Sequence, residues 1–116
     1  MSDSLSLAVE TFEAVPVLRL KGKLAYSQNF QPLYDTAARL RSEGHQRVVI
    51  DVSAVQSTDS TGMSALLEVR RIFGELPGAV ALLRPSDRLR AALAMIRVLS
   101  LFEVITEERE IPGPPR

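Results

Sequence analysis

The chain has 116 residues, with 14 Lys and Arg against 14 Asp and Glu, and 46% of its residues are hydrophobic. This size predicts a single domain with its own core. A formal net charge of zero argues against nucleic-acid binding, which needs a cationic surface. With no Cys and with His45 as the sole His, the composition excludes disulfides and a Cys nucleophile, and it leaves almost nothing for a metal site. We therefore predict no catalytic residue, no metal and no cofactor.

The N-terminal residues 1–4 carry no basic group, and no apolar run approaches the roughly 18 residues of a membrane span. These features predict a soluble, cytoplasmic protein without a leader and without membrane insertion.

Apolar and polar residues alternate over residues 4–9 and 15–20, which predicts two strands joined as a hairpin at Glu13-Ala14. Gly22 is expected to end the hairpin. Helical spacing over residues 30–40 predicts a helix with Pro32 in its first turn and Gly44 at its end. The β-branched run over residues 47–52 is typical of a strand covered on both faces.

After a polar turn at residues 57–60, a second helix is predicted to end by Gly74, and residues 79–83 form a short strand. Ser86 or Asp87 is expected to cap a third helix that runs to Leu99, before a last strand over residues 101–105. The order predicts an α/β fold: a mixed, partly parallel sheet of four to five strands, with an N-terminal β-hairpin and three or four helices packed on it. Residues 1–106 are the predicted domain, and 107–116 are a tail that we expect to be disordered.

The turn into the second helix carries the most specific information. Asp59 or Ser60 can serve as the N-cap, where a side-chain oxygen accepts an N–H of the first turn. Gly62 removes side-chain bulk where that turn approaches whatever docks there. Taken alone, these residues are also consistent with an ordinary helix cap. Tyr26 and Phe30, which follow Gly22, are expected to pack rather than to recognise a partner.

In its context, this segment resembles the signature of the STAS domain, a family shared by sulphate transporters and bacterial anti-sigma factor antagonists. Asp51-Val52-Ser53 follows an apolar strand, and the run from Asp59 to Met63 reads Asp-Ser-Thr-Gly-Met before a helix. One departure is notable. The family often has Gly-Glu-Leu-Asp at the end of the second strand, where this chain has Gly-Lys-Leu-Ala over residues 22–25.

The resemblance implies a phosphorylation-controlled protein-binding switch. In the stand-alone members the unphosphorylated form binds an anti-sigma factor that is also a serine protein kinase, and the phosphorylated form releases it. A metal-dependent serine phosphatase resets the cycle. The phosphorylated position corresponds to Ser60, with Thr61 as the second choice. The implied partner-binding residues are Asp59, Ser60, Thr61, Gly62 and Met63.

Three other hypotheses remain open from the sequence. An enzyme with Ser60 as nucleophile and Asp59 as its orienting acid lacks a base, because His45 lies at the far end of a predicted strand. A STAS accessory subunit that binds the ATPase of a lipid-transporting ABC system is disfavoured by Thr61, since such subunits tend to carry Ala there. A scaffold in a larger stress-signalling assembly is the third alternative.

Overall fold

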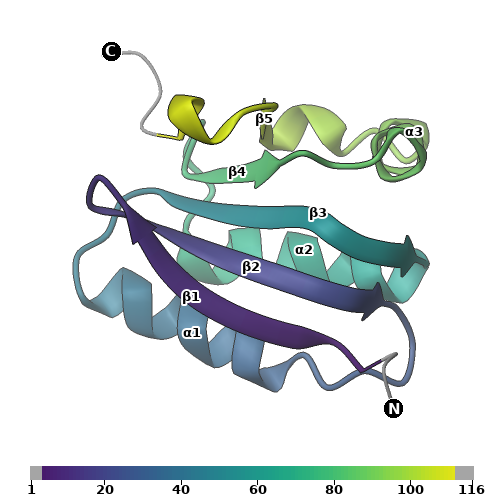
Figure 1. The fold of residues 1–116 in the computed structure, drawn as a ribbon, viewed down its shortest axis with the longest axis horizontal. Coiled ribbons are helices and arrows are strands. Elements are labelled where there is room, and N and C mark those ends of the chain that lie inside the picture. The colour runs from purple at the N-terminus through teal and green to yellow at the C-terminus, as the bar shows by residue number, and fades with distance from the viewer. Residues whose placement is uncertain (1–3, 112–116) are drawn as a thin grey trace.

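A computed structural model describes residues 4–111 of the chain (Figure 1). Its centre is a five-stranded sheet in the order β1-β2-β3-β4-β5. The strands are β1 (Ser6–Phe12), β2 (Val15–Leu24), β3 (Val48–Thr58), β4 (Val80–Leu83) and β5 (Glu103–Ile105). β1 and β2 pair antiparallel, and the remaining neighbours pair in parallel. The predicted mixed α/β sheet with an N-terminal hairpin is confirmed.

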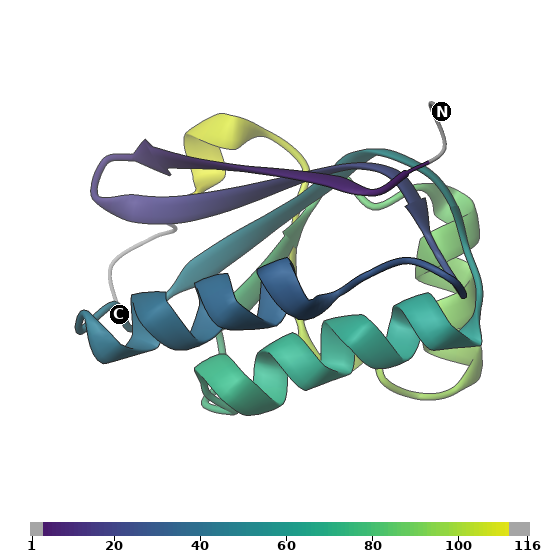
Figure 2. The same cartoon turned by 90° about the horizontal axis from the view of Figure 1, so that it is seen from below.

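Within residues 4–111 the helices are α1 (Gln31–Ser42), α2 (Ser60–Phe73) and α3 (Asp87–Met95), with 3-10 turns at Leu99–Leu101 and Glu108–Glu110. α1 and α2 lie side by side across one face of the sheet (Figure 2), and α3 lies at the end where β3 finishes. Leu18, Ile50 and Leu66 are fully buried between this face and the helices. None of these helices has the length and apolar character needed to cross a bilayer.

The hairpin turn and both ends of α1 lie where the local sequence predicted them. Glu13 and Ala14 form the hairpin turn with φ of 48° and 72°, the conformation that suits the twist of a tight hairpin. Pro32 lies in the first turn of α1, where its missing N–H leaves no helical bond unmade. Gly44 follows that helix with φ of +96°, a value that an L side chain rarely adopts.

β3 is longer than the sequence indicated, because it continues to Thr58 in the region expected to be a turn. β2 also extends past Gly22 to Leu24, and the two extensions pair with each other, Leu24 opposite Thr58. Gly22 lies inside β2 with φ of +110°, and a Cβ there would lie 2.6 Å from the carbonyl oxygen of Ser4. The predicted turn at residues 57–60 is therefore wrong for residues 57 and 58, and long-range strand pairing is the reason.

α3 ends at Met95 instead of continuing to Leu99, although the apolar spacing persists. Arg97 adopts a left-handed conformation with φ of +65°, and the N–H of Val98 turns back to the carbonyl of Leu93 at 2.9 Å. These contacts close the helix C-terminus in the manner of a left-handed cap.

The C-terminal segment covers the other face of the sheet, which corrects the expectation of disorder from residue 107. Residues 108–110 form a 3-10 turn, and Ile111 is fully buried against Val17, Val49 and Leu83. Nε of Arg47 donates to the carbonyl of Ile111 at 2.9 Å. A single large apolar side chain thus anchors a segment whose composition is otherwise polar. The rest of the predicted tail, residues 112–116, lies outside the described residues.

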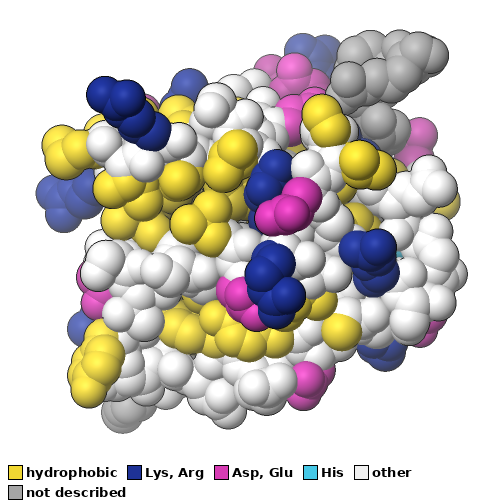
Figure 3. Space-filling model, turned by 180° about the vertical axis from the view of Figure 1, so that it is seen from behind, with side chains coloured by type: hydrophobic (Ala, Val, Ile, Leu, Met, Phe, Trp, Pro, Cys, Tyr) yellow, Lys and Arg dark blue, Asp and Glu magenta, His cyan; other side chains and the backbone are white. Residues whose placement is uncertain are grey.

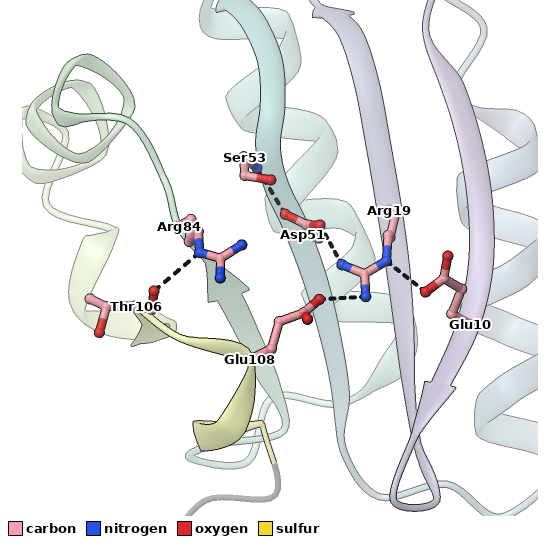
Figure 4. Close-up of polar contacts among 7 residues, drawn as sticks. All are labelled: Glu10, Arg19, Asp51, Ser53, Arg84, Thr106 and Glu108. Carbon is pink, nitrogen blue, oxygen red and sulfur yellow. Dashed lines mark hydrogen bonds and ion pairs between the residues drawn. The ribbon is translucent and has the colours of Figure 1, made fainter.

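Arg19 ties this segment to three strands on the same face (Figure 4). Its guanidinium contacts carboxylates of Glu10 at 2.8 Å, Asp51 at 2.6 Å and Glu108 at 2.5 Å. Hydrogen bonding to Glu10 first, and then to Asp51 and Glu108, raises the pKa of Arg19 above its usual range. The C-terminal turn is therefore held by both an apolar and an ionic contact.

We predict that Ile111→Ala lowers the free energy of unfolding by about 2 to 4 kcal/mol, because it empties a fully buried site. Urea denaturation measures the change. Leu76→Ala is the matched control, since Leu76 is 77% exposed and surface truncations usually change stability by less than about 0.5 kcal/mol. If both variants unfold at the same urea concentration, the C-terminal segment does not pack as described.

Candidate functional site

The residues singled out by the sequence gather where β2 and β3 end and α2 begins (Figure 1). Because β2 and β3 are parallel, Lys23 lies opposite Ser57 in the sheet, next to the predicted site. Asp59 alone separates β3 from α2. The departure from the family pattern at residues 22–25 is thus beside the motif in space as well, although Leu24 is fully buried and forms part of the core.

Asp59, rather than Ser60, is the N-cap of α2. One carboxylate oxygen, Oδ1, accepts the N–H of Gly62 at 3.0 Å, and the other, Oδ2, accepts the N–H of Tyr26 at 3.0 Å. These bonds from Tyr26 and then Gly62 hold the pKa of Asp59 below its usual value because they favour the charged form. One side chain therefore fixes both the start of α2 and the connection that follows β2.

Ser60 and Thr61 are the first two residues of α2, and both are exposed. Neither hydroxyl has a hydrogen-bond partner among residues 4–111. A hydroxyl at this position is accessible from solvent and lies at the positive end of the helix dipole. The geometry therefore leaves both as candidate acceptors and does not by itself rank one above the other.

Gly62 and Met63 face the protein interior. A Cβ on Gly62 would overlap the carbonyl oxygen of Leu24, so the element that approaches this glycine is β2 of the same chain. Met63 is half-buried and packs against the main core. Of the predicted partner-binding residues, the structure leaves Asp59, Ser60 and Thr61 exposed, whereas Gly62 and much of Met63 support them from within.

Asp51, the first acidic residue of the motif, lies apart from this group. It is 6% exposed and faces the outer side of the sheet, where Oδ1 accepts the N–H of Ser53 at 2.9 Å and Oδ2 accepts Arg19 (Figure 4). Burial alone raises the pKa of Asp51, but hydrogen bonds from Ser53 and Arg19 outweigh it and keep the pKa below its usual value. Asp51 is thus a structural residue that anchors the sheet.

Tyr26 is a candidate contact residue that the sequence did not reveal. Phe30 packs as expected, with its ring centroid 6.3 Å from that of Tyr34, but the side chain of Tyr26 is 76% exposed. Its backbone N–H is held by Asp59, 33 positions later. Local sequence carries no signal for this contact, because it joins distant parts of the chain.

His45 lies at the opposite end of β3 from Ser60, just before the strand starts. Eleven strand residues span about 35 Å, well beyond the reach of a proton transfer. Within residues 4–111, no group of three or more His, Asp or Glu side chains is arranged to hold a metal ion.

The family model described as STAS domain matches residues 6–111. None of the curated proteins searched matches this sequence. The fold resembles that of an anti-sigma factor antagonist from Mycobacterium paratuberculosis, with a TM-score of 0.77 and 18% identity over 97% of this chain and 94% of that chain.

Two further solved structures are of SpoIIAA. The anti-sigma factor antagonist SpoIIAA in its unphosphorylated form has a TM-score of 0.68 and 18% identity, over 90% of this chain and 92% of that chain. The Bacillus cell fate determinant SpoIIAA in the phosphorylated form has a TM-score of 0.68 and 20% identity, over 92% of this chain and 97% of that chain. At these identities the likeness shows the shared fold.

We predict that Gly62→Ala lowers the free energy of unfolding by about 3 kcal/mol, because the backbone of Leu24 occupies the space of the new methyl group and overpacking of this kind is costly. Thermal unfolding followed by circular dichroism measures the loss. Ser64→Ala, an exposed change on the same helix, is the control and should leave the unfolding midpoint within a few degrees. Equal midpoints for the two variants would show that α2 does not approach β2 this closely.

Asp59 should make stability depend on pH in a defined direction. Since its pKa is lower in the folded state than its usual 3.8, the stabilisation is complete above that value and is lost as pH falls through the folded pKa. Asp59→Asn keeps a cap oxygen but does not titrate. The stability difference between wild type and Asp59→Asn, measured by urea denaturation, should therefore be constant near neutral pH and shrink on acidification below about pH 4. A difference that stays constant down to pH 2 would contradict this assignment.

Proposed function

This chain belongs to the STAS domain family, and on that basis we propose that it is a bacterial anti-sigma factor antagonist that acts as a phosphorylation-controlled binding switch. In its unphosphorylated form it binds an anti-sigma factor that is also a serine protein kinase. Phosphorylation of Ser60 by that kinase releases the complex and returns the anti-sigma factor to its sigma factor. A metal-dependent serine phosphatase removes the phosphate.

The observation that carries this proposal is the placement of Ser60. Its hydroxyl is exposed at the first position of α2, while Asp59 and Gly62 beside it fasten the helix start to the end of β2. A kinase can therefore reach the hydroxyl without unfolding the domain. Thr61 is exposed as well, and it is the second candidate because Ser60 holds the position of the phosphorylated Ser in the family motif.

The phosphorylated domain is expected to keep its fold. A phosphoserine adds roughly −1.5 to −2 charge and three acceptor oxygens. At the start of α2, these oxygens lie at the favourable end of the helix dipole. Phosphorylation at a helix N-terminus is thus compatible with the helix that carries it.

The effect of the phosphate is expected to fall on the partner. Asp59 is ionised at neutral pH, since its pKa is lowered, and a phosphate on Ser60 adds to this negative charge at the same surface. In an interface built around the helix start, repulsion and desolvation of about 3 to 4 kcal/mol weaken binding a few hundredfold. Such a change operates a switch without a conformational change in this domain.

Two further observations support the proposal. Solved structures with this fold include anti-sigma factor antagonists, and SpoIIAA is described in both an unphosphorylated and a phosphorylated form. Catalysis by Ser60 has no support from the geometry, because both oxygens of Asp59 already accept backbone N–H groups and His45 is at the other end of β3. We accordingly propose a non-enzymatic role in the bacterial cytoplasm, where sigma factors act.

The decisive experiment is incubation with ATP and the cognate kinase, followed by mass spectrometry. Phosphate should appear on Ser60 in the wild type and in Thr61→Ala, and should be absent from Ser60→Ala. In calorimetry, Ser60→Glu should weaken kinase binding by roughly two orders of magnitude, while Ser64→Glu, an exposed change one turn later on α2, should have a much smaller effect.

Phosphate confined to Thr61 would move the switch by one residue. Phosphate on neither residue, or full binding by Ser60→Glu, would overturn the proposal. Binding to a transporter ATPase in place of the kinase would do the same.

A further inference from the structure

The exposed side of α3 combines apolar, small and cationic residues in one surface. Six large apolar side chains are exposed among residues 4–111, and three of them lie within residues 95–101. Met95 is 83% exposed and Ile96 is 48% exposed. Figure 3 shows apolar atoms gathered over α3 and the turn after it, at the upper left, with Lys and Arg side chains at the margin.

Two alanines occupy the middle of this surface. Leu89 and Leu93 point into the core, whereas Ala91 and Ala94 are exposed on the side turned away from the sheet. Small side chains on an exposed helix allow the backbone of a second helix to approach closely. The exposed side of α3 is therefore low at the two alanines, and the larger apolar side chain of Met95 projects at its C-terminal end.

The charge of this surface is cationic on balance. Arg88, Arg90 and Arg97 are exposed, and none of them forms an ion pair within residues 4–111. Asp87 is the single carboxylate on α3. An arginine presents a planar set of donors that matches a carboxylate in a bidentate pair, so a partner of opposite charge is the complementary one.

We propose that this surface, defined by Arg90, Ala91, Ala94, Met95 and Ile96, docks an acidic amphipathic helix of a protein partner. The apolar face of that helix lies on the alanines and against Met95, and its Glu or Asp side chains pair with the arginines. Methionine and arginine are enriched at the centres of protein interfaces. The proposal is argued from the residues of α3 and of the turn after it, and it names no kinase.

Two other occupants fit less well. A second copy docked on the same surface by two-fold symmetry brings unpaired arginines together, which like-charge repulsion opposes. An anionic membrane has the right charge, but α3 has nine residues and uses Leu89 and Leu93 in the core, which leaves less apolar surface than interfacial helices present.

The Met95 end of this surface lies away from the proposed switch, whereas Arg88, near the start of α3, lines a pocket together with Ser57 and Thr58 of β3. Nε of Arg70 donates to the carbonyl of Leu101 at 3.2 Å, so the turn after α3 lies beside the third turn of α2. Ten residues separate Ser60 from Arg70, or about 15 Å along the helix. A helix docked against this end of α3 contacts the domain away from the Ser60 hydroxyl.

The test is an NMR titration of the full ¹⁵N-labelled chain with a synthetic amphipathic helical peptide whose polar face carries Glu. The amides of residues 87–101 should shift, and the same peptide with Lys in place of every Glu should leave them unchanged. Met95→Ser and Arg90→Glu should each weaken binding roughly tenfold. The matched controls are Leu76→Ser, at a side chain 77% exposed elsewhere, and Lys21→Glu, at an exposed lysine of β2; both should bind as the wild type does.

Several results would overturn the inference. These are failure of the Glu peptide to shift these amides, equal binding of the Lys peptide, and a loss of binding in Leu76→Ser as large as that in Met95→Ser. Shifts of the same amides with phosphatidylglycerol vesicles alone would assign the surface to a membrane. Shifts that appear on raising the protein concentration without peptide would assign it to a second copy. None of these measurements includes the kinase, so a negative result does not contradict the proposed switch at Ser60. In the same way, a negative result in the phosphorylation experiment does not contradict the docking proposal.

Discussion

The first turn of α2 lies directly against the end of β2, and this is possible because residue 62 has no side chain. The carbonyl oxygen of Leu24 occupies the space that a Cβ of Gly62 would need. Asp59 reinforces the contact, since its two oxygens accept the N–H groups of Gly62 and Tyr26. The helix start is thus fixed to the sheet by shape and by hydrogen bonds, and the hydroxyl of Ser60 is displayed from a rigid support.

A second set of contacts fixes the opposite face of the sheet. Arg19 joins Glu10, Asp51 and Glu108, and Ile111 fills an apolar site beneath the C-terminal turn. Both sides of the parallel strands are therefore covered, as strands of this kind require. Because Asp51 serves this face and Asp59 serves the helix start, the two acidic residues of one sequence motif stabilise different parts of the fold.

These constraints suit the proposed switch, which acts by a change of surface charge. With a formal net charge of zero, one phosphate on Ser60 would change the charge balance of the whole molecule, and the change would be concentrated beside an ionised Asp59. The exposed side of α3 has the opposite sign, with three arginines that lack an ion pair among residues 4–111. Both proposals for this chain therefore rest on local charge.

The sequence by itself determined the α/β order, the hairpin turn and the helix signals at Pro32 and Gly44, because each depends on local periodicity or on backbone conformations that few residues adopt. The motif from Asp59 to Met63 is identified by its resemblance to the signature of the family. Tertiary structure decided the features that depend on distant residues. β3 extends to Thr58 since β2 pairs with it, residues 107–111 are ordered because Ile111 finds a buried site, and Gly62 faces Leu24 rather than a partner. The N–H of Tyr26 donates to Asp59, 33 positions later, and no local pattern of residues encodes a contact of that range.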